Sequence, residues 1–217
     1  MSDALPTELP SDLASALELA LVAGASSPSG EADGVDGRRL RAERGRSAVL
    51  AAALDLVDSG NPAPTIAEIA ASSGISERTI FRYFPDRDAL FIALVFEVIP
   101  RIAALLSFDR PSGTLETRVR SLVAQRIEFV RVAGPLARSV ETLSPHSPVA
   151  AMMLQLRRTR LRDQVVAWLG PELAADDTER ITVIDALLSR PVIESLLADL
   201  DEATLRALTD SIIRIVG

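Results

Sequence analysis

The stretch from Thr65 to Leu90 decides the fold and reads TIAEIAASSGISERTIFRYFPDRDAL. Thr65 and Glu68 have the spacing of a capping box, in which each side chain bonds the other residue's backbone N–H, so a short helix is predicted to begin here. Ser73-Gly74 is predicted to end that helix, because glycine readily adopts the left-handed conformation of a sharp turn. The stretch therefore begins with a short helix that a tight turn closes.

A second short helix follows the turn. Ser76 is its predicted N-cap and Pro85 is predicted to end it, with Asp86 capping the helix after that. Two short helices joined by a Gly-containing turn form a helix-turn-helix, whose second helix fits the major groove of B-DNA. The apolar positions predicted to point inward, whatever the function, are Ile66, Ile69, Ile75, Ile80 and Phe84.

The outward positions of the second helix carry side chains suited to DNA. Arginine pairs bidentately with guanine, threonine and phenylalanine contact the thymine methyl group, and serine and tyrosine bond phosphate. Backbone N–H groups at the two helix N-termini are further phosphate donors. The alternative for the arginines is an ordinary solvated helix face. The candidate DNA-binding residues of this stretch are Thr65, Ser76, Glu77, Arg78, Thr79, Phe81, Arg82 and Tyr83.

A longer helix is predicted before this stretch, because Val49, Ala53, Leu56 and Val57 recur at helical spacing and Gly60 ends the pattern. The three helices together predict an N-terminal DNA-binding domain.

The charge of the chain is divided along its length. Thirty acidic and 23 basic residues give a formal net charge of −7, which taken alone argues against a nucleic-acid partner. Residues 1–37 hold seven acidic residues and no basic one, so the rest of the chain is neutral. Residues 38–46 hold five arginines and one glutamate. Beside a helix-turn-helix we expect this basic block to lie along phosphates, with Arg44 and Arg46 as candidates; the alternative is a solvated helix end.

Residues 44–60, RGRSAVLAAALDLVDSG, and then residues 65–90 resemble the N-terminal DNA-binding domain of the TetR family of bacterial transcriptional regulators. The resemblance lies in the order of helix, capped short helix, Gly turn, the T-I-F-x-Y-F pattern and a basic residue before the next helix. It covers about residues 44–95.

The resemblance also implies roles for single residues. Phe81 stands where tyrosine is commoner in the family, so a hydroxyl contact is absent. Glu77 is acidic at a DNA-facing position, where it either accepts from a cytosine amino group or only favours the helix N-terminus. Arg87 occupies the family's phosphate-contact position at the start of the next helix. The remaining implied contacts to DNA come from Thr79, Phe81, Tyr83 and the backbone at Thr65.

Composition argues against other classes of function. Cysteine is absent from the sequence, which removes thiolate nucleophiles, disulfides and cysteine-bound metals, and His146 is the single histidine. The sequence shows no nucleophile–base pair, phosphate-binding loop or metal-ligand spacing, so we predict no enzyme activity, no metal and no cofactor. Uninterrupted apolar runs are too short for a membrane span.

The acidic leader, residues 1–37, is predicted to be mostly disordered. Residues 12–23 have the spacing of a short helix, and residues 24–37 are rich in Gly and Ser, as flexible linkers are. Glu18 and the lack of a positively charged start argue against a secretory signal. The alternative is that the leader's acids transiently cover the chain's own basic surface.

Residues 86–217 are predicted to form a second, wholly helical domain. Its first helix, residues 86–106, contains Pro100, which removes one backbone hydrogen bond and is expected to kink or break the helix. Pro135 is predicted to open a new helix at its first position. Helices are expected at about residues 115–130, 135–143, 148–169, 178–189, 191–199 and 202–216.

One set of side chains in this domain is a candidate for ligand binding. Methionine and aromatic side chains adapt to apolar molecules, so they suit an effector pocket, although the alternative is an ordinary core. The candidates are Phe129, Met152, Met153, Leu156 and Trp168.

A second set is a candidate for dimerisation. The resemblance implies that the last two long helices pair with their symmetry mates in a dimer, which suits a palindromic operator. The alternative is that the apolar side chains along these helices only close the monomer's own core. The candidates are Ile184, Leu188, Leu205, Leu208, Ile212 and Ile215.

These patterns predict an all-α protein with an acidic leader (1–37), a helix-turn-helix DNA-binding domain (38–85) and a helical effector-binding and dimerisation domain (86–217). The expected function is a cytoplasmic, ligand-responsive repressor. It binds a palindromic double-stranded operator as a homodimer, is released by an at least partly apolar small molecule, and has no membrane partner. The alternative is a helical protein-interaction module with a vestigial helix-turn-helix.

Overall fold

The structure is a computed structural model that describes residue 15 and residues 37–173, 177–198 and 201–217. All regular secondary structure in this part of the chain is helical, which confirms the all-α fold. The expectations for the acidic leader, including a short helix at residues 12–23, fall outside the described residues apart from Ser15.

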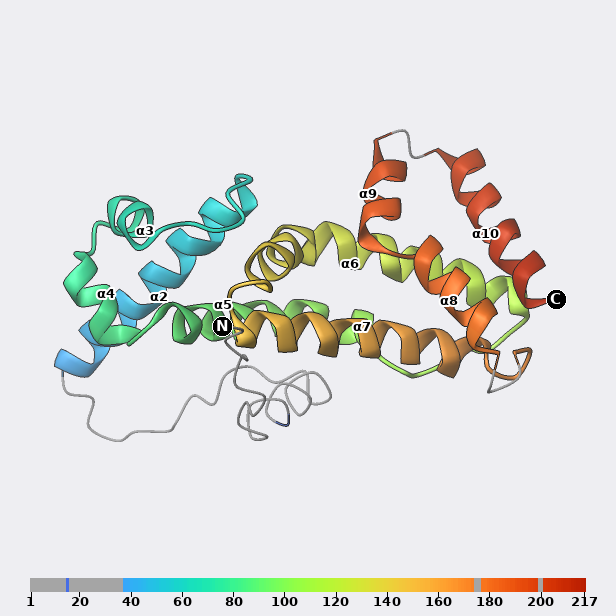
Figure 1. Ribbon diagram of the computed structural model, residues 1–217, viewed down its shortest axis with the longest axis horizontal. Coiled ribbons are helices and arrows are strands. Elements are labelled where there is room, and N and C mark those ends of the chain that lie inside the picture. The colour runs from blue at the N-terminus through green and yellow to red at the C-terminus, as the bar shows by residue number, and fades with distance from the viewer. Residues whose placement is uncertain (1–14, 16–36, 174–176, 199–200) are drawn as a thin grey trace, which may run out of the picture. The chain divides into compact units, whose positions relative to one another are not determined.

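The helices follow one another with short connections (Figure 1). Most of the predicted helices are confirmed, and their ends lie within one to three residues of those that the capping and helix-ending residues predicted. Their bounds are α2 Gly37–Asp58, α3 Ile66–Ser73, α4 Glu77–Tyr83, α5 Arg87–Ile102, the 3₁₀ helix η1 Ala103–Leu106, α6 Leu115–Leu143, α7 Pro148–Leu169, α8 Thr178–Leu187, α9 Arg190–Leu197 and α10 Glu202–Val216.

The described residues group into two compact units. The first unit holds the described part of Met1–Arg101 together with Pro135–Leu154, and the second holds Ile102–Gly134 with the described part of Gln155–Gly217. Helices α6 and α7 therefore each contribute to both units. The functional boundary expected at residues 85 and 86 stays a prediction.

The first unit is built around the helix-turn-helix. Helix α2 packs against α3 and α4, and buries Val49, Ala53 and Val57. Ile80 and Phe84 meet this core from the second short helix and its end, at 0% and 1% exposure. Helix α5 adds a buried face made of Leu90, Phe91, Leu94, Val98 and Ile99.

Pro100 lies inside α5, and the α-helix ends two residues later at Ile102, where η1 takes over. Proline has no amide hydrogen to bond the carbonyl of Phe96, and a tighter 3₁₀ turn often replaces the weakened end of an α-helix. By length and composition, the stretch Arg87–Leu106 would also suffice to cross a membrane. Helix α5 buries an apolar face in the first unit, and this place in a protein core explains its apolar composition.

The prediction that Pro135 opens a new helix is wrong. Helix α6 runs without interruption from Leu115 to Leu143 and contains Pro135 in its interior. The missing amide leaves the carbonyl of Arg131 without its helical donor. The preceding residue, Gly134, has no Cβ to clash with the proline ring, so an α-helical conformation is tolerated there.

The second unit buries polar side chains among its long helices. Gln164 of α7 is 1% exposed, and its Nε2 donates to the carbonyls of Leu105 at 3.0 Å and Ser107 at 2.9 Å, with Gln125 Oε1 at 3.1 Å. Arg118 at the start of α6 pairs with Glu172 after α7. These bonds tie α7 to η1 and α6.

Arg126 is the most deeply buried charge among the described residues, at 3% exposure. Its Nη2 donates to the Leu161 carbonyl at 3.1 Å. Burial lowers the pKa of Arg126 to about 10, and the nearby carboxylate of Asp185 partly opposes that shift. Burial in turn raises the pKa of Asp185, which Arg126, Arg162 and Arg158 partly oppose.

Candidate nucleic-acid interface

The N-terminus of α3 is a complete capping box. The Thr65 hydroxyl accepts from the Glu68 backbone N–H at 3.2 Å, and the Thr65 backbone N–H donates to Glu68 Oε2 at 2.7 Å. This backbone bond and the bond from the Thr65 hydroxyl lower the pKa of Glu68, because both stabilise its carboxylate. The sequence prediction of the box is confirmed, and the hydroxyl of Thr65 is committed to it.

The turn between the two short helices also follows the prediction. Gly74 has φ +70° and ψ +13°, the left-handed conformation, and its N–H bonds the Ala70 carbonyl at 3.0 Å. Ser76 then caps α4 by accepting from the Thr79 backbone N–H at 3.4 Å. The two hydroxyls of Ser76 and Thr79 bond each other at 3.0 Å. The start of the second helix is thus held by its own polar side chains.

Helix α4 has two faces. Ile80 is fully buried, whereas Glu77, Arg78 and Arg82 are exposed. Phe81 lies on the outer side with 47% of its surface exposed. Contact of an apolar aromatic ring with water is unfavourable. An exposed ring between exposed arginines is well suited to contact base edges and thymine methyl groups.

The end of α4 is anchored to α2 by Arg46. Its Nη1 donates to the Tyr83 carbonyl at 3.2 Å, and its guanidinium lies 4.5 Å from the centre of the Phe84 ring. A cation is favourable at a helix C-terminus. Arg46 therefore has a structural partner, although its side chain is exposed; Arg44, two residues earlier, is exposed as well.

Tyr83 is half-buried against α2, and Gly45 makes this possible. A Cβ atom at position 45 would overlap the Tyr83 hydroxyl oxygen. The guanidinium of Arg82 lies 5.5 Å from the centre of the Tyr83 ring. The role of Gly45 was missed from the sequence, because a glycine within a helix pattern gives no sign of what it faces.

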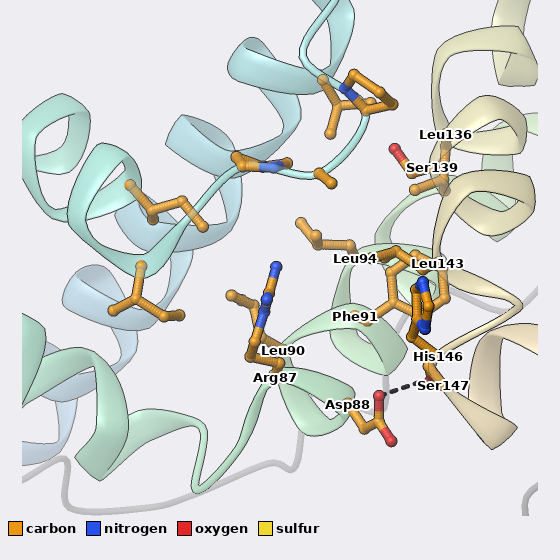
Figure 2. A pocket seen from close by; sticks show the side chains of 16 residues that line it. Arg87, Asp88, Leu90, Phe91, Leu94, Leu136, Ser139, Leu143, His146 and Ser147 are labelled. Carbon is orange, nitrogen blue, oxygen red and sulfur yellow. Dashed lines mark hydrogen bonds between the residues drawn. The ribbon is translucent and has the colours of Figure 1, made fainter.

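Arg87 is the first residue of α5 and is exposed. Asp86 caps the same helix by accepting from the Ala89 backbone N–H at 2.7 Å. Arg87 has no hydrogen bond or ion pair with another described residue, so its charge is available to a ligand. Figure 2 shows that it also borders a cavity, which the sequence did not indicate.

Part of this chain is similar in sequence to known proteins. Residues 49–94 match the family of bacterial regulatory proteins described as tetR family. The HTH-type transcriptional repressor LfrR of Mycolicibacterium smegmatis is 34% identical over 95 residues, which are 43% of this chain and 48% of that repressor. The HTH-type transcriptional regulator BetI of Rhizobium meliloti is 29% identical over 162 residues, 69% of this chain and 79% of the relative.

The helix-turn-helix of this chain is therefore of the type found in TetR-family bacterial transcriptional regulators. A second BetI, from Paraburkholderia phymatum, is 25% identical over 62% of this chain and 71% of its own length. The chain spans about half of LfrR. No solved structure matches it.

The five residues predicted to line an effector pocket are divided between the units. Met152 and Met153 belong to the first unit, while Phe129, Leu156 and Trp168 belong to the second. Phe129, Met153 and Trp168 are buried, and the other two are half-buried. None of the five lines the cavity at Arg87 or the groove between α6 and α10 described next, so their role in ligand binding stays a prediction.

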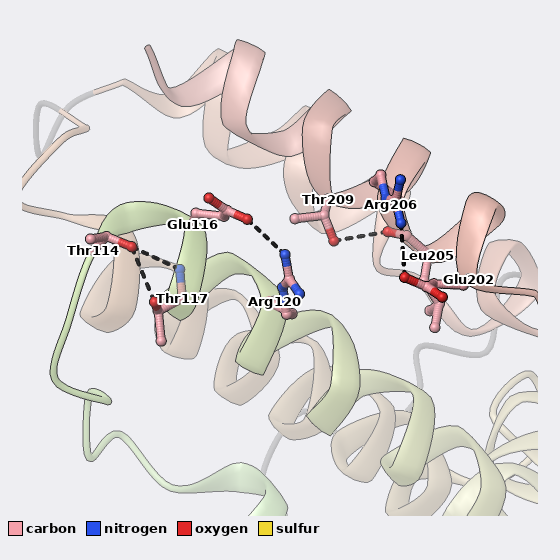
Figure 3. A network of polar contacts seen from close by, with 8 residues as sticks. All are labelled: Thr114, Glu116, Thr117, Arg120, Glu202, Leu205, Arg206 and Thr209. Carbon is pink, nitrogen blue, oxygen red and sulfur yellow. Dashed lines mark hydrogen bonds and ion pairs between the residues drawn. The ribbon is translucent and has the colours of Figure 1, made fainter.

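The second of these cavities is a groove of about 370 Å³ between α6 and α10. Figure 3 shows the charged side chains along these two helices, where Arg120 pairs with Glu116 at 2.6 Å and Arg206 pairs with Glu202 at 2.8 Å. These charges beside the groove are therefore matched within each helix.

Four of the six predicted dimerisation residues are buried within the single chain. Ile184 and Ile212 are fully buried, and Leu188 and Leu208 are nearly so. Helices α8 and α10 are in contact within the chain. Leu205 and Ile215 remain half-exposed, and dimerisation itself stays a prediction.

Proposed function

We propose that this TetR-family regulator is a cytoplasmic repressor that binds a palindromic operator as a homodimer and leaves it when a small, partly apolar effector binds. The observation that carries the proposal is the two-faced helix α4, with Ile80 in the core and Arg78, Phe81 and Arg82 exposed on a scaffold of capped short helices. The name of the relative LfrR, a repressor, supports the sign of regulation.

In this proposal the exposed residues of α4 read base edges. Arg78 and Arg82 pair with guanine, and Phe81 contacts a thymine methyl group. Glu77 and Thr79 complete the face that reads the bases. The contacts of the predicted domain 38–85 with the DNA backbone come from Ser76, Thr65 and Tyr83. Arg87 and Arg44 hold phosphates, whereas Arg46 holds α4 in place.

Dimerisation is proposed for the domain 86–217 through α8 and α10. Val183 of α8 is 48% exposed, and α10 leaves Leu205 and Ile215 half-exposed beside the buried stripe. A dimer with isologous contacts suits a palindromic operator, on which two recognition helices lie about one turn of DNA apart. An effector then releases DNA by binding better to a state with a different spacing.

Three substitutions test the reading face. Arg78→Ala and Arg82→Ala should weaken operator binding and relax the preference for one base pair by about 1–3 kcal/mol, because each removes a base contact. Arg87→Ala should weaken binding to all sequences alike and lower the slope of log affinity against log salt by about 0.9, because it removes a phosphate contact. Binding is measured on variant operators selected from the DNA upstream of the chain's own gene.

Arg101→Ala is the matched control, since Arg101 is an exposed arginine at the other end of α5. It should leave operator affinity unchanged. Sequence-blind losses of equal size for Arg78, Arg82 and Arg87 would refute the assignment of the reading face. A chain without any sequence preference would favour the alternative of an interaction module with a vestigial helix-turn-helix.

A further inference from the structure

A cavity of about 160 Å³ lies under the helix-turn-helix, wholly within the first unit. Its walls come from the end of α2, the loop that leads into α3, α3 itself, the first turns of α5, the C-terminal part of α6 and the loop before α7. The lining is mostly apolar and includes the buried residues Val57, Leu90, Phe91, Leu94 and Leu136.

One unpaired charge enters this cavity. Figure 2 shows the guanidinium of Arg87 extending into the open space, while the neighbouring Asp88 points the other way. The Asp88 carboxylate accepts from the Ser147 hydroxyl at 2.8 Å. Arg87 makes no such bond with the described residues. His146 lines the cavity as well and adds an imidazole that can donate a hydrogen bond.

The size and lining restrict the ligand. An apolar protein cavity of about 150 Å³ is large enough to take up benzene. A single ring or a short alkyl chain therefore fits the apolar part of this cavity. An arginine that has no partner among the described residues, beside buried apolar side chains, is matched by a carboxylate, which it binds through charge-assisted hydrogen bonds.

We propose that the cavity binds a small apolar monocarboxylate, with its ring or chain against Phe91 and Leu94 and its carboxylate on Arg87. Binding itself follows from the cavity and does not depend on the function of the chain. A regulatory effect of binding rests on the proposed function, in which Arg87 holds a DNA phosphate. A carboxylate on Arg87 takes the side chain away from phosphate, so the ligand opposes operator binding directly.

Benzoate is the probe, and benzamide is its uncharged counterpart of the same shape. Calorimetric titration of the full chain should show saturable binding of benzoate, and thermal unfolding should show a rise in Tm, because the ligand binds the folded state. Benzamide should bind at least tenfold more weakly. Absence of saturable benzoate binding, or equal binding of the two compounds, would overturn the proposal.

Two variants locate the site. Arg87→Ala should weaken benzoate binding at least tenfold, and Ala63→Met should abolish it by filling the cavity from the loop before α3. Their matched controls are Arg101→Ala on α5 and Ala51→Met on the exposed side of α2, and neither residue lines the cavity. Circular dichroism of each variant checks that it is folded. Unchanged benzoate affinity in both cavity variants would place the ligand elsewhere and refute the assignment.

Operator binding separates this proposal from the proposed function. At matched ionic strength, benzoate should lower operator affinity several-fold. In a separate salt titration, saturating benzoate should reduce the slope of log affinity against log salt by about 0.9, the share of one phosphate contact. Both effects should be absent in Arg87→Ala. Benzoate binding with an unchanged operator affinity would overturn the regulatory part alone. A chain that takes up benzoate at Arg87 but binds no operator would refute the proposed function and leave the cavity assignment standing.

Discussion

The helix-turn-helix and the second unit use polar side chains in opposite ways. In the helix-turn-helix, Thr65, Ser76 and Asp86 each bond the backbone N–H of a residue three positions later, at exposed helix ends. In the second unit, Gln164 bonds carbonyls 57 and 59 positions away, and Arg126 bonds one 35 positions away. The first kind of contact shapes a local element, and the second joins elements that are distant in the chain.

This difference has an energetic side. An exposed cap competes with water, so its loss costs about 1 kcal/mol. A buried acceptor that loses its donor has no water to replace it and costs about 1–3 kcal/mol. We therefore expect the substitutions with the largest effect on stability to lie in the second unit.

The largest effect is expected for Gln164→Leu. The substitution keeps the volume of a buried side chain but removes the donor for the carbonyls of Leu105 and Ser107, and should lower the free energy of unfolding by about 2 kcal/mol. Urea unfolding measures this loss. Gln155→Leu is the control, on an exposed position of the same helix α7, and should change the free energy by less than about 0.5 kcal/mol. Equal losses for Gln164→Leu and Gln155→Leu would show that the buried contacts of Gln164 do not stabilise the fold more than an exposed glutamine does.

A smaller effect is expected for Thr65→Ala. It removes the N-cap of α3 and should lower the free energy of unfolding by about 1 kcal/mol, while Thr65→Ser should retain most of the stability. The same urea experiment, with amide hydrogen exchange of α3 as a local probe, measures it. A loss as large as that of Gln164→Leu would show that the caps contribute as much as the buried contacts.

The smallest effect is expected for the pH dependence of the capping box. The pKa of Glu68 lies below its ordinary value of 4.5, because its carboxylate accepts from Thr65. The folded state then binds this proton less readily than the unfolded state, so the stabilisation is present above the unfolded pKa and lost as the pH falls through the folded pKa. Glu68→Gln should therefore lower the Tm at neutral pH and have no effect in strong acid.

Glu97→Gln, at an exposed position of α5, is the control for this measurement. Thermal unfolding across the acid range should show the same pH dependence for this variant as for the unmodified chain. A Glu68→Gln variant whose deficit persisted in strong acid would show that charge is not what stabilises the box.

The local elements were predictable because their signals lie within a few residues. The Thr65–Glu68 box, the turn at Gly74 and the caps at Ser76 and Asp86 were expected from the sequence, and the structure contains all of them. Pro135 is the exception. Proline at a first helical position and proline inside a helix look alike in sequence, and the adjacent Gly134 allows the second.

The contacts that join distant elements were not predictable in the same way. The approach of Tyr83 to Gly45 connects α4 with α2, and the cavity at Arg87 is assembled from segments around residues 57–69, 87–94 and 136–147. The net charge of −7 conflicts with the expected binding to DNA. All of this negative charge lies in residues 1–37, and the rest of the chain is neutral.

The sequence by itself determined the helical class, the helix-turn-helix with its caps and outward arginines, and the resemblance to the TetR family. These features depend on spacing, capping and turn chemistry, which act over one or two helical turns. Only the tertiary structure decided that Arg46 anchors α4, that most of the predicted dimerisation stripe is buried within the chain, and that Arg87 faces a cavity as well as solvent. Burial and cavities arise where distant segments pack together, and no local pattern of residues specifies which segments will meet.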